Sequence, residues 1–117
     1  MALQKIGKMS LKNQGGFVAR IMFSYLLENG EKRLSEHTGD ITLGQTKTVD
    51  PGDLGVPDGS VVWMYVFVVW GRDNEAKRAF LYEKGNPNTA HYSISGTTLD
   101  NELGLIDITQ TQSLLAA

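Results

Sequence analysis

The chemistry of this sequence starts with its two histidines, because histidine is the side chain best suited to moving protons near neutral pH. His37 lies in a polar stretch, and His91 precedes Tyr92 and Ser93. A Ser-His-Asp triad is defined by geometry and not by order along the chain, so a triad stays open as an alternative. However, the segment Ser93–Gly96 lacks the leading glycine of a G-x-S-x-G turn, and metalloprotease and phosphate-loop motifs do not occur. We therefore expect no catalytic residues and no enzymatic activity.

A second group that could do chemistry is the acidic, glycine-rich run from Asp50 to Gly59. Its carboxylates, Asp50, Asp53 and Asp58, are oxygen ligands of the kind that Ca²⁺ prefers. The run lacks the alternating ligands and the terminal glutamate of an EF-hand. Asp-Pro-Gly and Pro-Asp-Gly are ordinary turn formers, so we expect two consecutive turns here, with no metal and no cofactor.

Two groups combine aromatic rings with hydrogen-bonding side chains, as sugar-binding sites do. The first predicts a carbohydrate-binding lectin as one alternative function and consists of Tyr82, Asn86, Asn88, His91 and Tyr92. The second is the cluster of Trp70, Arg72, Asp73 and Asn74, in which the guanidinium of Arg72 could stack on the indole ring or pair with Asp73. The competing interpretation is that both groups are hairpin ends with solvated side chains.

The segment Val61–Trp70 is apolar throughout and carries no charge. Nine of its ten residues are β-branched or aromatic, which predicts a strand. Alternation places Val61, Trp63, Tyr65, Phe67 and Val69 on one face, and Val62, Met64, Val66, Val68 and Trp70 on the other. A strand at the surface of a sandwich should have one polar face that is exposed to solvent. Because both faces of this strand are apolar, we expect the second face to be covered.

Three alternatives remain for that cover. The chain itself could supply it, a second copy could supply it in a homo-oligomer, or a lipid surface could. Trp63, Tyr65 and Trp70 are of the types that favour the headgroup level of a membrane. Our leading hypothesis is therefore a non-enzymatic module that binds a membrane surface or a cell-surface lipid, of a cytolytic or defensive toxin type. A lectin and a self-assembling structural protein are the alternatives.

The elements that position these residues are predicted to be strands. Turn-forming Gly, Asn, Asp and Pro recur at short intervals, and the segments between them have the length typical of β-sandwiches. Asn29-Gly30 is a strong hairpin signal. Besides Val61–Trp70, the strands that we expect cover residues 6–12, 17–27, 40–49, 76–83, 89–95 and 99–108. The fold class is all-β: an antiparallel β-sandwich of about seven to eight strands with immunoglobulin-like or jelly-roll topology.

Length and composition bound these hypotheses. The 117 residues fit a single domain, with residues 109–117 expected to form a loose tail. There is no cysteine, which excludes disulfides and thiolate sites. The net charge is −2 and the basic residues are scattered, so we do not expect a nucleic-acid partner.

The first nine residues lack the apolar run of a signal peptide, so we expect a cytoplasmic protein or one released by a non-classical route. In architecture the chain resembles the compact β-sandwich proteins that microbes use as lectins or membrane-binding toxins. That resemblance implies a fold and leaves the ligand open.

Overall fold

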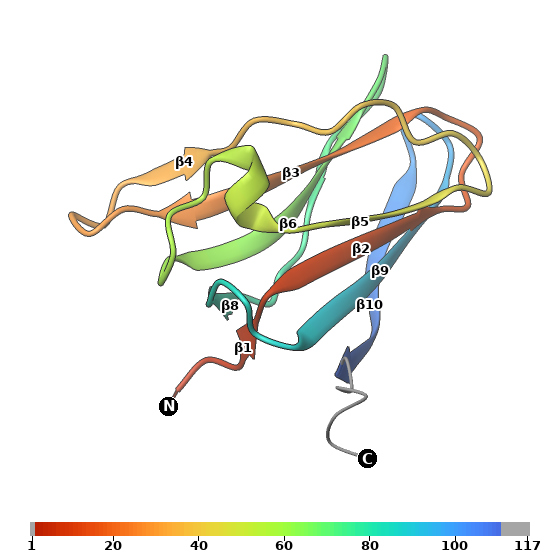
Figure 1. Cartoon of the computed structure of the whole chain (residues 1–117). Coiled ribbons are helices and arrows are strands. Elements are labelled where there is room, and N and C mark those ends of the chain that lie inside the picture. The colour runs from red at the N-terminus through yellow and green to blue at the C-terminus, as the bar shows by residue number, and fades with distance from the viewer. Residues whose placement is uncertain (1, 111–117) are drawn as a thin grey trace.

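The protein is a β-sandwich in which two sheets pack face to face (Figure 1). The computed structural model describes residues 2–110. Its elements are β1 (Lys5–Ile6), β2 (Lys8–Asn13), β3 (Ala19–Leu26), β4 (Lys32–Leu34), β5 (Thr46–Val49), the 3₁₀ helix η1 (Pro51–Leu54), β6 (Val61–Val68), β7 (Asn74–Glu75), β8 (Phe80–Tyr82), β9 (Asn88–Gly96) and β10 (Asn101–Gln110). The predicted all-β sandwich is confirmed, with more and shorter strands than the sequence indicated.

The first sheet has the strand order β1-β8-β6-β3-β4, with β7 also paired to β6, and the second has the order β10-β9-β2-β5. Most neighbours are antiparallel, as expected. However, β1 runs parallel to β8 and β2 runs parallel to β9, so both sheets are mixed.

Both parallel pairs arise because the N-terminal strand changes sheets at Gly7. β1 lies in the first sheet and β2 in the second, so the single strand predicted over residues 6–12 is divided. A Cβ atom at Gly7 would lie 2.1 Å from the carbonyl oxygen of Asn86. Only glycine allows the chain to cross this close to another backbone segment.

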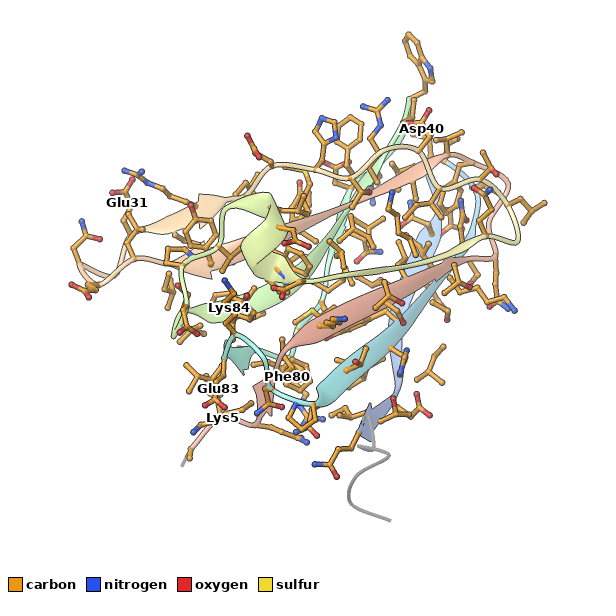
Figure 2. All side chains as sticks on the ribbon, viewed as in Figure 1. Lys5, Glu31, Asp40, Phe80, Glu83 and Lys84 are labelled. Carbon is orange, nitrogen blue, oxygen red and sulfur yellow. The ribbon has the colours of Figure 1, made fainter. Side chains whose placement is uncertain are left out.

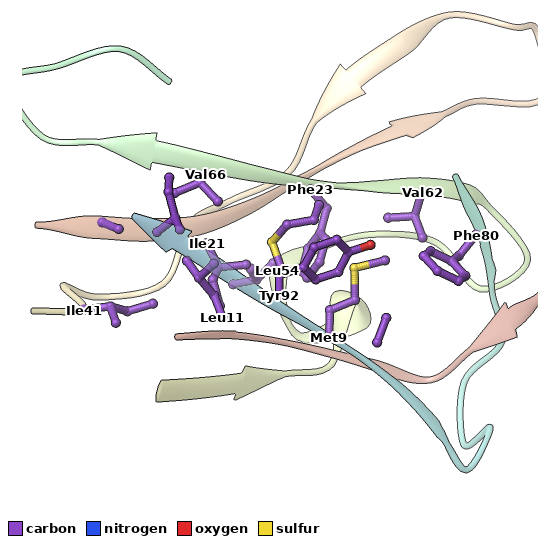
Figure 3. Packing of buried hydrophobic residues seen from close by; sticks show 14 of the residues in the cluster. Met9, Leu11, Ile21, Phe23, Ile41, Leu54, Val62, Val66, Phe80 and Tyr92 are labelled. Atoms are coloured by element: carbon purple, nitrogen blue, oxygen red, sulfur yellow. The ribbon is translucent and has the colours of Figure 1, made fainter. Parts of the chain in front are cut away.

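The core lies between the sheets and is formed by alternate residues of their strands (Figure 3). In β6 the inward residues are Val62, Met64, Val66 and Val68, and all four are buried. They pack with residues of β2, β3, β8 and β9, and the turn around η1 adds Leu54 and Val56 to the same cluster. Burial of one face of each strand fixes the register, because a slip of one residue would turn that face outward.

The segment between β3 and β6 contains less regular structure than predicted. The Asn29-Gly30 hairpin forms as expected and joins β3 to the short β4, with Gly30 at a positive φ of 85°. The strand predicted over residues 40–49 is regular only in β5, and Ile41 makes an isolated bridge to Ala19. The tail predicted over residues 109–117 begins within β10, and residues 111–117 lie outside the described residues.

Candidate functional site

The outward face of β6 is covered by charged side chains of the same chain. Trp63, Tyr65 and Phe67, which we call the aromatic row, are half-buried on this face. The ammonium group of Lys32 lies 4.7 Å from the ring centre of Trp63, and the guanidinium carbon of Arg20 lies 5.7 Å from that of Phe67. Such cation–π contacts shield an aromatic ring while keeping the charge near water. Of the three alternatives for the cover of this strand, the structure therefore shows the first, in which the chain itself supplies it.

Both of these cations are held in place by carboxylates. Lys32 Nζ lies 2.9 Å from Glu75 Oε2, and Arg20 Nε lies 2.7 Å from Asp40 Oδ1. Glu75 also accepts a hydrogen bond from the hydroxyl of Ser24. Each end of the aromatic row is thus closed by an ion pair that is itself partly exposed.

Tyr65, in the middle of the row, is tied to the loop that follows β6. Its hydroxyl donates a hydrogen bond of 2.7 Å to one carboxylate oxygen of Asp73. The other oxygen of Asp73 accepts the backbone N–H of Val68 at 3.0 Å. Burial and the neighbouring carboxylate raise the pKa of Tyr65 to about 12, because both disfavour the phenolate.

Trp70 does not belong to the buried face on which alternation placed it. The strand ends at Val68, where the carbonyl oxygen accepts the N–H of Gly71 in a tight turn. Trp70 has a φ of 62° and is 93% exposed. The assignment of Trp70 to the face of Val62 and Met64 was therefore wrong. The reason is the reversal of the chain, which turns the indole ring into solvent.

The turn that follows β6 lies at one end of the sandwich, where four connecting segments gather (Figure 1), and Trp70 belongs to this turn. We call this the loop end; it consists of residues 14–18, 39–45, 69–73 and 97–100. Backbone hydrogen bonds link these segments: Val69 to Val18 at 3.0 Å, and Arg72 to Thr98 at 2.8 Å. Figure 2 shows Asp40 at this end, while Lys5, Glu83 and Lys84 lie at the opposite end.

The loop end carries three large apolar side chains that face water. They are Trp70, Leu99 at 69% exposure and Leu43 at 64% exposure, each from a different segment. Sequence reasoning missed Leu43 and Leu99. The available signal was an isolated leucine inside a polar, turn-forming stretch, where no strand partner could bury it.

Asparagines brace the turn that presents Trp70. The side chain of Asn101 donates to the carbonyl oxygen of Arg72 at 2.9 Å, and the side chain of Asn74 donates to Asn101 Oδ1 at 2.9 Å. Arg72, predicted as a possible stacking partner of Trp70, has an exposed side chain. This network holds the exposed indole ring on a fixed turn.

The predicted sugar-binding group is not brought together on one surface. Tyr82 and Tyr92 are each 1% exposed and lie in the core. Asn86 bonds to the side chain of Glu83, and Asn88 bonds to the carbonyl oxygen of Lys5. Neither tyrosine therefore presents its ring to a ligand, and the asparagines serve a turn.

Both histidines are engaged in hydrogen bonds within the chain. His91 lies on the outer face of the second sheet, where Nδ1 contacts the hydroxyl of Ser10 and Nε2 contacts that of Thr109 at 2.7 Å. A hydroxyl therefore stands where a triad has its carboxylate, and Ser10 is buried. His37 Nδ1 lies 2.7 Å from the carbonyl oxygen of Thr38.

The acidic run forms the two turns that were predicted. Asp50 caps η1 by accepting the N–H of Gly52 at 2.9 Å, and it also accepts the hydroxyl of Tyr82. Asp58 accepts the N–H of Lys84 at 2.8 Å. Within residues 2–110 no three His, Asp or Glu side chains are grouped so that they could hold a metal ion.

Comparison with known proteins finds similarity in structure only. No family model and no curated protein sequence matches the chain. Pneumolysin superposes on 86% of this chain with a TM-score of 0.50 and 18% identity, and the match covers 23% of the pneumolysin chain. The cytotoxin suilysin from Streptococcus suis superposes on 91% of this chain with a TM-score of 0.50 and 15% identity, covering 24% of its own chain.

At these identities the likeness establishes a shared fold. This chain corresponds to less than a quarter of the pneumolysin and suilysin chains. Over the part of the chain that the structure describes, no helix is both long and hydrophobic enough to span a bilayer.

Proposed function

We propose that this chain is a non-enzymatic module that docks on a membrane surface through its loop end. The observation that carries the proposal is Trp70, a tryptophan almost wholly in water on a braced turn. A large exposed apolar side chain with no packing role marks an interaction site. Tryptophan in particular favours the interface between headgroups and hydrocarbon.

Leu43 and Leu99, on two other segments of the loop end, add to the apolar surface that is exposed there. Burying a side chain of this size contributes about 2 kcal/mol relative to water. Three such side chains on one end of the molecule give a reversible, moderate membrane affinity. Because the turn is braced before docking, little conformational entropy is lost when the indole ring inserts.

The shared fold supports this proposal from a second direction. Suilysin, which shares the fold, is a cytotoxin. We extend the proposal to a toxin-like role of a cytolytic or defensive kind. The apolar strand contributes the scaffold of the loop end, and Trp63 and Tyr65 are not membrane contacts in this proposal.

The experiment uses the two tryptophans of the chain as separate reporters. In Trp63→Phe the only indole is Trp70, and we expect vesicles of phosphatidylcholine, with and without sterol or anionic lipid, to shift its emission to the blue. In Trp70→Phe the only indole is Trp63, and we expect no shift. Co-sedimentation with the same vesicles should fall at least fivefold in Trp70→Ala.

The control for Trp70→Ala is Lys77→Ala, which removes an exposed side chain outside the loop end. It should sediment with vesicles as the unmodified chain does. If no vesicle composition shifts the emission of Trp70, the membrane proposal is wrong.

We propose that self-association, if it occurs, follows docking. In solution the outer face of β6 is covered by Arg20 and Lys32 of the same chain, which leaves that face poorly suited to a second copy. Light scattering at micromolar concentration should give the monomer mass. A dimer mass in the absence of lipid would favour the self-assembling alternative.

A further inference from the structure

A second surface has the composition of a binding site and is separate from the loop end. It is the aromatic row on the outer face of β6. Its three rings occupy alternate positions of one strand, so their attachment points are about 7 Å apart along a line. Such a row suits a ligand that repeats along its length.

The row leads into a groove at the end of the molecule opposite to Trp70. The groove has a volume of about 550 Å³ and is lined by the β3–β4 hairpin and the residues that lead into β6. Val61 and Leu26 belong both to the groove and to the outer face. A chain-like ligand could therefore run along β6 from the rings into the groove without a break.

The charges on this surface select the kind of ligand. Lys32 pairs with Glu75, and Arg20 pairs with Asp40, so the cations are neutralised where they stand. An anionic polymer would find no free positive charge in these two pairs. A hydrocarbon surface or an apolar protein face would have to desolvate both ion pairs, which is unfavourable.

The arguments against an anionic polymer and against an apolar surface do not apply to a neutral sugar chain. The C–H faces of a hexose pack on aromatic rings, and its hydroxyl groups both donate and accept hydrogen bonds. They can replace water on Glu75, Asp40 and the two cations without breaking the ion pairs. Lys32 and Arg20 lie over the rings of Trp63 and Phe67, so sugar binding requires these two long side chains to move to the ring edges while they stay paired.

We propose that the outer face of β6 binds a neutral hexose polymer, with Trp63, Tyr65 and Phe67 as stacking platforms. The ion pairs Lys32–Glu75 and Arg20–Asp40 supply the polar contacts that orient the sugar. This site differs from the one that the sequence predicted around Tyr82 and Tyr92. It does not depend on the membrane proposal.

The test follows the two indole N–H signals of the unmodified protein by nuclear magnetic resonance, assigned with Trp70→Phe. The probes are laminarin, cellohexaose, maltohexaose and chitohexaose. We expect at least one of them to shift the Trp63 signal in a saturable manner and to leave the Trp70 signal in place. Vesicles should do the opposite, so failure of one proposal is distinguishable from failure of the other.

Variants then locate the site. Trp63→Ala should weaken binding of the active probe at least tenfold, whereas Trp63→Tyr, which keeps a stacking ring, should stay within threefold. Trp70→Ala should bind the sugar unchanged. The proposal is overturned if none of the four probes shifts Trp63, if Trp63→Ala binds as well as the unmodified chain, or if the Trp63 signal depends on protein concentration, which would indicate a second copy on this face.

Discussion

One carboxylate, that of Asp73, joins the hydroxyl of Tyr65 to the backbone N–H of Val68, at 2.7 Å and 3.0 Å respectively. Tyr65 is the central ring of the outer face of β6, and Val68 is the last residue of the strand before the turn that carries Trp70. The two candidate surfaces are therefore coupled through a single side chain.

Asp73→Ala removes both of these hydrogen bonds. We expect the free energy of unfolding to fall by about 1–3 kcal/mol, because a phenol and a backbone N–H lose a charged acceptor. We also expect weaker vesicle binding at unchanged lipid composition, since the Trp70 turn loses the hydrogen bond between Asp73 and Val68. Urea denaturation and co-sedimentation measure the two effects.

The control for this prediction is Asp100→Ala, which removes an exposed carboxylate from the neighbouring segment of the loop end. Its stability should change by less than about 0.5 kcal/mol. If Asp73→Ala and Asp100→Ala are equally stable, the hydrogen bonds from Tyr65 and Val68 to Asp73 do not contribute to the free energy of unfolding.

Gly71 is the second point at which the Trp70 turn is sensitive. A Cβ atom there would lie 2.2 Å from the carbonyl oxygen of Thr98, which is backbone and cannot rotate away. Gly71→Ala should therefore push the Trp70 turn away from the 97–100 segment. The expected result is weaker vesicle binding with both exposed leucines intact.

Proton exchange measures the same displacement without lipid. The N–H of Arg72 donates to Thr98 at 2.8 Å and should exchange faster with solvent in Gly71→Ala. Gly16→Ala is the matched control, since a Cβ at Gly16 meets nothing within 4 Å. If the Arg72 N–H exchanges at the same rate in Gly71→Ala, in Gly16→Ala and in the unmodified chain, the close approach to Thr98 does not hold the turn.

The phenols predict a loss of stability at high pH. Burial raises the pKa of Tyr65 and of Tyr92 to about 12, from an ordinary value of 10.0, and raises that of Tyr82 further. A raised pKa in the folded state means that the unfolded chain loses these protons first. The folded state is thus favoured fully below pH 10, and this contribution is lost as the pH rises towards 12.

Ultraviolet titration of the phenolate absorbance tests this sign. The chain has four tyrosines, and three of them should resist ionisation until the fold opens. In the presence of urea all four should titrate near pH 10. A native titration that matches the denatured one would contradict the burial of these rings.

Local patterns in the sequence predicted the fold and the inward face of β6, because alternation is a property of the strand itself. The same alternation places Tyr92 with Ala90 and Ile94, and Tyr82 with Phe80, all of which are buried. Those two tyrosines were assigned to a binding site because of their residue type, against the alternation that described their surroundings.

The cover of the aromatic row could not be predicted in this way. Arg20 reaches Phe67 and Lys32 reaches Trp63 only through the pairing of β6 with β3 and of β3 with β4. The β3–β4 pairing is a local hairpin, but the register of β3 against β6 depends on contacts between segments more than thirty residues apart, which a local pattern does not contain. Trp70 was misplaced for a related reason, since alternation assumes that the strand continues, and its end at Val68 depends on Asp73 and Gly71.

Tyr92 offers the last prediction, because its hydroxyl is buried and, among the described residues, has no hydrogen-bond partner. A buried hydroxyl without a partner costs about 1–3 kcal/mol of desolvation. Tyr92→Phe removes the hydroxyl and keeps the ring in the core. We expect a stability gain of about 1 kcal/mol, seen as a rise of a few degrees in Tm.

The same chemical change at Tyr82 is the matched control. Its hydroxyl donates to Asp50, so Tyr82→Phe leaves that carboxylate short of a donor. Tyr82→Phe should lower the free energy of unfolding by about 1 kcal/mol, opposite in sign to Tyr92→Phe. If both variants are destabilised alike, the Tyr92 hydroxyl has a hydrogen-bond partner in solution, and the prediction is wrong.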